Sequence, residues 1–280
     1  MNRRSFFKML SFGSMILAGP LGLMAGFWEK GEKNYWENGI FRQKSIDISN
    51  IESGIIRARI DNSWLEYSIK KLPSDFMEWN LGSRLKALKA MREGTGGFTL
   101  GGPHSGMVAT WGGKRKDSVF TLNNAVKGIG MAPASGKVDS FIEHMVSHGN
   151  DDMRDKLDWL IELYGNHENF DPRMQTSLEL YTSRDFETHT FLNIMENPAA
   201  TIVFLDRQSF EVRSIARIVH PGDNTADEYE KKLLKYVNRI HGFFHGEFSI
   251  EFPLLIFYAV EVFDNTPGNK KGVRIMPPLL

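Results

Sequence analysis

The chain has 280 residues, enough for one large or two small domains, and its 41% hydrophobic and 24% charged residues are ordinary for a globular protein. Its 34 basic and 34 acidic side chains balance, which disfavours a nucleic-acid-binding protein, since that class needs a basic excess. The chain has no cysteine, which excludes disulfides, thiolate catalysis, Cys-ligated zinc and iron–sulfur clusters.

The first residues have the features of an export signal. Two adjacent arginines, Arg3 and Arg4, precede an uncharged stretch over residues 9–28 that glycine and proline keep only weakly hydrophobic. This order resembles a twin-arginine signal peptide, so residues 1–26 are predicted to be a leader and not part of the fold. A single transmembrane helix is the alternative, although its glycine and proline content disfavours it. We expect the twin-arginine translocase to export the folded protein to the periplasm or another extracytoplasmic site, with a membrane anchor if the leader is not cleaved.

Residues 27–72 are predicted to be an N-terminal extension that lies across the domain. Ile55–Ile60 alternates apolar and charged residues, which predicts a short strand, and Tyr67–Leu72 has the same pattern in a weaker form. The main domain, residues 73–280, is predicted to open with a helix, because apolar residues recur at helical spacing until Gly94 ends the pattern.

A glycine-rich passage, residues 94–106, follows this helix. Main-chain amides in such loops can bind phosphate. The passage matches neither a P-loop nor a dinucleotide-binding fingerprint, so turns between short strands are the simpler interpretation. Met107–Trp111 and Ser118–Leu122 are then predicted to pair as a hairpin.

Residues 138–164 are predicted to form two helices, with Asp139 as the N-cap of the first and Trp159 on the apolar face of the second. His144 and His148 lie four residues apart on one helix face, which is the spacing of a metal-binding pair. No third ligand is evident in the sequence, so two surface histidines are the simpler interpretation and no metal site is predicted.

The pattern changes to strands after residue 176. Three strands are predicted at Ser177–Tyr181, Ala200–Leu205 and Phe210–Val219. A helix with an apolar stripe follows, opened by a capping box of Thr225 and Glu228. A last, strongly apolar strand is predicted at residues 254–263.

Residues 177–219 resemble the FMN-binding split barrels of the pyridoxamine 5′-phosphate oxidase-like family. The resemblance rests on the order of a strand that ends in a Thr-Ser turn, a short helix that ends at Asn-Pro, and two further strands, at residues 180–184, 191–198, 200–206 and 212–219. The following helix and strand continue this order to residue 263. The resemblance implies an α+β fold, a split β-barrel with flanking helices, and a helical insertion at about residues 123–176.

The resemblance also implies a phosphate site. In that family the flavin phosphate binds hydroxyl, main-chain and cationic donors at the turn after the Thr-Ser strand and at the start of the short helix, where the helix dipole favours an anion. The matching cofactor-binding positions here are Thr182, Ser183, Arg184, Thr188, His189 and Thr190. Thr190 stands where the family usually has Lys or Arg, so Arg184 or Arg173 would have to replace that cation. A polar turn that only caps the helix is the alternative.

Three functions follow as expectations. The first is an exported FMN-binding oxidoreductase that forms a homodimer with flavin at the subunit interface, whose small-molecule substrate or redox partner the sequence does not name. The second is a non-catalytic binder of haem or flavin, for which His241 and His245, four residues apart, are candidate haem ligands. The third is an exported interaction domain without a cofactor.

Overall fold

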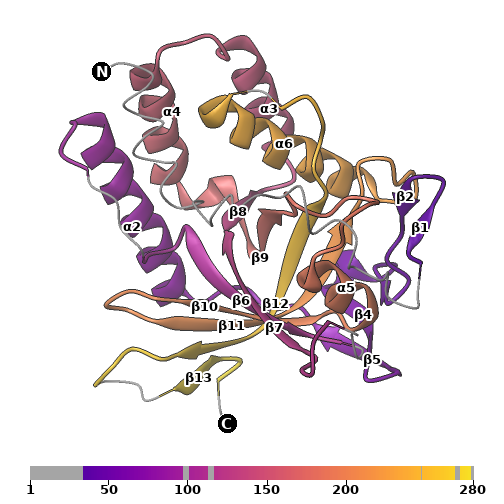
Figure 1. Cartoon of the computed structure of the whole chain (residues 1–280). Coiled ribbons are helices and arrows are strands. Elements are labelled where there is room, and N and C mark those ends of the chain that lie inside the picture. Colours follow the sequence, from indigo (N-terminus) through magenta and orange to yellow (C-terminus); the bar gives the residue numbers. More distant parts are fainter. Residues whose placement is uncertain (1–33, 97–100, 113–116, 247, 269–271, 279–280) are drawn as a thin grey trace.

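The computed structural model describes residues 34–96, 101–112, 117–246, 248–268 and 272–278 (Figure 1). The predicted leader, residues 1–26, lies outside the described residues. Over the described part the chain is a mixed α+β protein with five α-helices and thirteen strands, built on one strongly curled antiparallel sheet. This confirms the predicted fold class of a split barrel with flanking helices. None of the described helices is both long and apolar enough to cross a membrane.

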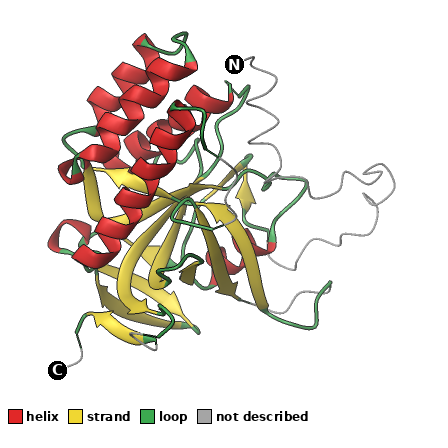
Figure 2. Ribbon diagram, turned by 90° about the vertical axis from the view of Figure 1, so that its left-hand side faces the viewer, coloured by secondary structure: helices red, strands yellow, loops and turns green. Residues whose placement is uncertain are grey.

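The main sheet has eight strands, and all of its pairs are antiparallel. In spatial order they are β7 (Leu122–Gly128), β6 (Ser105–Trp111), β10 (Ala199–Phe204), β11 (Phe210–Val219), β12 (Leu254–Asp264), β9 (Phe170–Leu178) and β8 (Gly130–Pro133), with β13 (Val273–Met276) paired to the end of β12. The sheet curls into a half-barrel, which Figure 2 shows from the side.

One run of chain joins the two edges of this half-barrel. β7 pairs with β6, and β8 pairs with β9, while only Ile129 separates β7 from β8. Ile129 is fully buried and its main-chain N–H donates to the carbonyl oxygen of His104 at 2.8 Å. Gly130 follows it, where a Cβ atom would come within 3.2 Å of Thr176 Oγ1. A small residue at this corner therefore lets the strand leave one neighbour and join the other.

Four helices gather at one end of the half-barrel, and the fifth lies apart beside the sheet (Figures 1 and 2). The four are α2 (Ser74–Arg92), α3 (Val138–Ser147), α4 (Met153–Gly165) and α6 (Glu228–His245); the fifth is α5 (His189–Glu196). α2 packs against α4, and α3 packs against α6. Short 3₁₀ turns, η2 (Ile51–Ser53) and η3 (His167–Asn169), complete the helical structure of the described residues.

The N-terminal extension is an integral part of the fold. Its strands are β1 (Trp36–Glu37), β2 (Ile40–Phe41), β3 (Ile46–Asp47), β4 (Ile55–Ile60) and β5 (Ser63–Ser68), of which the last three form a small sheet. Trp36 and Phe41 pack on Phe191 of α5 at ring-centroid distances of 6.1 and 4.8 Å. The extension therefore holds α5 against the half-barrel.

Two buried clusters stabilise the molecule. In the first, Phe76 and Trp79 of α2 pack on Phe204 and Phe210 of the sheet, with ring centroids 5.2–5.7 Å apart. In the second, β4, α3 and α6 pack on the other face of β9, β11 and β12. Burying one large apolar side chain contributes roughly 1.5–3 kcal/mol, so these clusters supply much of the stability.

Several predicted elements are confirmed and others are shifted. The first helix, the two helices of the 138–164 segment and the strand at Ile55–Ile60 are present. The strand predicted at Tyr67–Leu72 is wrong, because β5 begins at Ser63 directly after a two-residue turn. Both turn residues, Asp61 and Asn62, have positive φ values of 49° and 65°, as a type I′ hairpin turn requires.

Two strands of the sheet lie away from their predicted positions for a common reason. The strand predicted at Ser118–Leu122 is wrong, because β7 occupies Leu122–Gly128, and the strand predicted at Ser177–Tyr181 is wrong, because β9 occupies Phe170–Leu178. Both strands carry polar residues on the faces that other strands fill with apolar ones. The predicted insertion, residues 123–176, thus contains α3 and α4 but also most of β7, all of β8 and most of β9.

The capping box predicted at Thr225 and Glu228 is also wrong, because the box of α6 lies two residues later. The N-cap of α6 is Asp227, whose carboxylate accepts from the main-chain N–H of Glu230 at 2.7 Å. Glu230 in turn accepts from the main-chain N–H of Asp227. Thr225 instead donates its hydroxyl to Asp223 at 2.7 Å, one turn before the helix.

Candidate functional site

The predicted site residues lie at the start of α5. Thr188 is the N-cap, and its hydroxyl oxygen accepts from the main-chain N–H of Phe191 at 3.1 Å. Thr182 lies across the turn, with its hydroxyl 3.1 Å from that of Thr188. The two threonines hold the 182–188 loop against the helix, so the structure brings together the two ends of the predicted site.

A buried ion pair is hydrogen-bonded to this turn through Thr188. Glu179, which is 1% exposed, accepts from Lys127 Nζ at 2.6 Å and from the Thr188 hydroxyl at 3.3 Å. Lys127 reaches it from β7. The charges of this pair balance each other, so the turn rests on a neutral polar network. Sequence reasoning missed both residues, because they are 52 positions apart and no local pattern connects them.

His189 and Thr190 face β7 and the chain just before it. His189 Nε2 lies 3.0 Å from a carboxylate oxygen of Asp117. Thr190 is 2% exposed, and its hydroxyl accepts from Asn123 Nδ2 at 3.0 Å. The residue at the usual basic position of the family therefore points into the protein and is already hydrogen-bonded.

A hydrogen bond between α5 and β6 fixes the other side of the helix. Asn193 Nδ2 donates to Thr110 Oγ1 at 3.2 Å and to the carbonyl oxygen of Thr121 at 3.3 Å. Gly112 lies so close that a Cβ atom there would be 3.0 Å from the Asn193 Cα atom. The turn is thus held by contacts to β6, to β7 and to the end of β9.

The turn and the first residues of α5 carry donors that have no acceptor among the described residues. Arg184 is exposed, and its guanidinium has no partner among the described residues. Ser183 is exposed, and its hydroxyl oxygen accepts from the main-chain N–H of Phe186 at 3.2 Å, which leaves its own proton free to be donated. The main-chain N–H groups of His189 and Thr190, the first two of α5, have no acceptor within the described residues. Such a set can bind an anion.

The other predicted replacement cation is not available. Arg173 on β9 makes a two-pronged contact with Asp171, with Nη2 to Oδ2 at 2.6 Å and Nε to Oδ1 at 3.0 Å. The hydrogen bonds to Asp171 raise the pKa of Arg173. Because Arg173 is engaged in this way, Arg184 is the cation that the turn offers.

An apolar strip lies on the outer face of β6 and β7, opposite the face from which Asn123 and Lys127 reach the α5 turn. Met107 of β6 pairs across the strands with Val126 of β7, and Trp111 pairs with Leu122. Met107, Val126 and Leu122 are 40%, 73% and 60% exposed. Exposed apolar side chains that cluster on one face mark an interaction surface.

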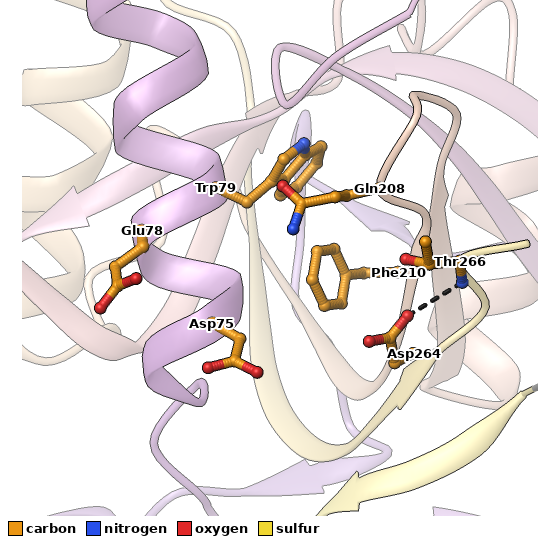
Figure 3. Close-up of a pocket in the computed structure, with 7 residues that line it drawn as sticks. All are labelled: Asp75, Glu78, Trp79, Gln208, Phe210, Asp264 and Thr266. Atoms are coloured by element: carbon orange, nitrogen blue, oxygen red, sulfur yellow. Dashed lines mark hydrogen bonds between the residues drawn. The ribbon is translucent and has the colours of Figure 1, made fainter. Parts of the chain in front are cut away.

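A cavity of about 390 Å³ opens between α2 and the adjoining ends of β11 and β12 (Figure 3). It is lined by Asp75, Glu78, Trp79, Gln208, Phe210, Asp264 and Thr266. The Trp79 and Phe210 rings form its apolar part, and Asp264 accepts from the main-chain N–H of Thr266 at 2.9 Å. Three carboxylates in one cavity repel phosphate, so this cavity does not suit the phosphate of a flavin.

The histidine pairs show no metal site. The rings of His144 and His148 stack at 4.1 Å, and His144 also stacks on Trp159 at 4.5 Å. On α6, burial and then the charge of His245 lower the pKa of His241 to about 4, so its imidazole is neutral at pH 7. Among the residues that the structure describes, no group of three or more His, Cys, Asp or Glu side chains could hold a metal ion.

Comparison with models of known protein families finds no match, and comparison with curated proteins finds no similar sequence. The resemblance to the split-barrel family therefore depends on the order of motifs along the chain and on the curled sheet with its flanking helices. These features define a class of fold. Function has to be inferred from the chemistry of the site.

Proposed function

We propose that this protein is an exported FMN-binding oxidoreductase of the pyridoxamine 5′-phosphate oxidase-like class. The observation that carries the proposal is the turn at the start of α5, which carries the exposed Arg184 and leads into a helix whose first two main-chain N–H groups, like the Arg184 guanidinium, have no partner among the described residues. A phosphate carries about two negative charges and is bound by donors of this kind.

The donors at the turn are of the kinds that bind a phosphate, but they include one cation fewer than is usual in the family. Ser183 would donate a hydroxyl, Arg184 would supply the charge, and the dipole of α5 would add to it. Thr182 and Thr188 would position the turn instead of binding, because their hydroxyls already bond each other and Glu179. Lys127 balances the Glu179 charge, which would otherwise repel an anion above it.

FMN, when bound, would supply the redox chemistry itself. The chain would bind and orient it, and the apolar strip of Met107, Leu122 and Val126 would cover an apolar ring system or a second subunit. We propose a homodimer because this strip is exposed on the outer face of the sheet. The proposed substrate is a small molecule or a redox partner.

The first test is the visible absorption spectrum of the purified protein, followed by titration with FMN. Paired flavin bands, or quenching of FMN fluorescence on binding, are expected. A colourless protein that does not take up added FMN would overturn the proposal and leave an exported interaction domain. A Soret band would instead support the alternative of a non-catalytic haem binder, with His241 or His245 as the candidate ligand.

A pair of arginine variants tests the site itself. Arg184→Met should weaken FMN binding by roughly 10-fold to 100-fold, since a charge-assisted hydrogen bond contributes about 1.5–3 kcal/mol. Arg207→Met is the matched control, because Arg207 is also exposed in a turn but lies outside the α5 site. Equal binding by the two variants would contradict the assignment of Arg184.

Export is a separate part of the proposal and has its own test. Replacing both Arg3 and Arg4 by Lys should leave the protein in the cytoplasm of a host with an active twin-arginine pathway. Fractionation of these cells measures this, and an unchanged periplasmic signal would contradict the route.

A further inference from the structure

Arg84 is a buried cation in the middle of α2. It is 8% exposed, and its donors reach into the corner of the half-barrel. Nη2 donates to the carbonyl oxygens of Pro103 and Ile129 at 2.7 and 2.6 Å, and Nε donates to Asn80 Oδ1 at 2.8 Å. The guanidinium also lies over the Tyr164 ring, 5.4 Å from its centroid. These contacts satisfy the carbonyl groups that the bend at Ile129 leaves outside the sheet ladder.

No carboxylate balances this charge. Among the described residues no Asp or Glu forms an ion pair with Arg84, and every other acceptor around it is neutral. Buried charges in proteins are usually paired, because removing an ion from water is costly. The buried Arg217, in contrast, is paired with Glu230 in the ordinary way. Within the described part of the chain, Arg84 is therefore a buried cation that lacks its counter-ion.

Donors around Arg84 also lack acceptors. A guanidinium has five N–H donors, and the three hydrogen bonds above leave both donors of Nη1 without a partner among the described residues. Asn80 is completely buried, and its Nδ2 group has no hydrogen-bond partner there either. Burial raises the pKa of Tyr236 on α6, Arg84 partly offsets that rise, and the Tyr236 hydroxyl makes no hydrogen bond to the described residues. All of these donors could bind an anion.

His104 connects the neighbourhood of Arg84 to the surface. It follows Pro103, whose carbonyl oxygen accepts from Arg84, and its side chain is exposed. A Cβ atom on Gly128 would be 3.9 Å from the His104 ring, so the ring lies beside the end of β7.

We propose that Arg84 and Asn80, with Tyr236 and His104 beside them, form a binding site for one small oxyanion, either a carboxylate or a phosphate. The two N–H groups of Nη1 that remain would donate to oxygens of such a ligand, and the ligand would supply the missing negative charge. The site shares no residue with the turn at α5, so it is independent of the proposed flavin site.

Asn80→Asp tests the proposal without removing Arg84. The new carboxylate would still accept from Arg84 Nε and would supply the counter-charge from within the chain. Binding of acetate and inorganic phosphate is measured by isothermal titration calorimetry at low ionic strength. We expect the wild-type protein to bind both at this site and Asn80→Asp to lose at least tenfold in affinity, with a melting temperature equal to or above that of the wild type.

Two control variants separate this site from a general charge effect and from the α5 site. Ala87→Glu adds the same charge at an exposed position of α2 and should keep wild-type binding. Arg184→Met removes the proposed phosphate contact at α5 and should leave acetate binding unchanged. The proposal is overturned if the wild-type protein binds neither anion, if Asn80→Asp binds as tightly as the wild type, or if only Arg184→Met loses binding.

Discussion

Arg217 and Glu230 form an ion pair that links β11 to the first turn of α6. Nε lies 2.9 Å from Oε1 and Nη2 lies 3.2 Å from Oε2, and the two side chains are 7% and 1% exposed. Asp223 lies 3.8 Å from the same guanidinium, and despite its burial the surrounding hydrogen bonds and Arg217 lower its pKa. Glu230 also closes the capping box with Asp227. One buried carboxylate thus serves both the ion pair and the helix start.

Arg217→Met should therefore lower the free energy of unfolding by about 3–5 kcal/mol, because it leaves Glu230 buried and charged without a partner. Urea denaturation followed by circular dichroism measures this. Lys231→Met is the control, because it breaks the exposed pair with Glu228 on the same helix and should change stability little. If both variants lose the same free energy of unfolding, the buried pair stabilises this fold no more than the exposed pair does.

At the scale of elements, one buried side chain links the N-terminal extension to two other elements of the fold. Gln43 is buried, and its amide Nε2 donates to the carbonyl oxygens of Ile194 and Ala216 at 3.0 and 3.1 Å. Its Oε1 atom accepts from the main-chain N–H of Ile218 at 2.8 Å. Gln43 thereby joins the extension to α5 and β11 through main-chain groups that lie outside regular pairing.

Gln43→Ala should lower the free energy of unfolding by about 3 kcal/mol, since an unsatisfied buried polar group costs about 1–3 kcal/mol and three such groups lose their partner with partial relaxation. Chemical denaturation measures the loss, and hydrogen exchange should show faster exchange in α5. Gln208→Ala is a control at an exposed position. A loss below about 1 kcal/mol would mean that water replaces the amide and that the extension is only loosely held.

The elements whose positions the sequence predicts correctly are those whose buried face is mainly apolar. β4 has this pattern, and α2 buries five apolar side chains beside Asn80 and Arg84, so the spacing of apolar residues still predicts both elements. β7 and β9 do not have this pattern, because Lys127, Gln175 and Glu179 lie inward on or just after these strands. The turn at α5 is predictable from its threonines. The ion pair of Lys127 and Glu179 that supports this turn is not, because the two residues are distant in the chain and no local pattern predicts their contact.

At the scale of the whole molecule, the curled sheet leaves one outer face without a covering helix. Four helices gather at one end and α5 lies apart (Figure 1). β6 and β7 present the apolar strip of Met107, Leu122 and Val126 to solvent. A monomer that exposes such a strip on a strand edge is prone to associate. A second copy of the chain would bury the strip by the same surface on both subunits, as two-fold symmetry requires.

Val126→Lys should therefore convert the proposed dimer to a monomer, because it places a charge at the most exposed of these three positions, opposite Met107. Light scattering coupled to size-exclusion chromatography measures the mass of each species. Leu65→Lys on β5 is the control, since Leu65 is also an exposed aliphatic residue, at 51%, but lies on the separate three-stranded sheet. If flavin lies at the subunit interface, Val126→Lys should also lose FMN affinity while Leu65→Lys keeps it. A wild-type protein that is monomeric at all concentrations would contradict the dimer, and loss of FMN binding by Val126→Lys in such a monomer would place the strip in the cofactor site itself.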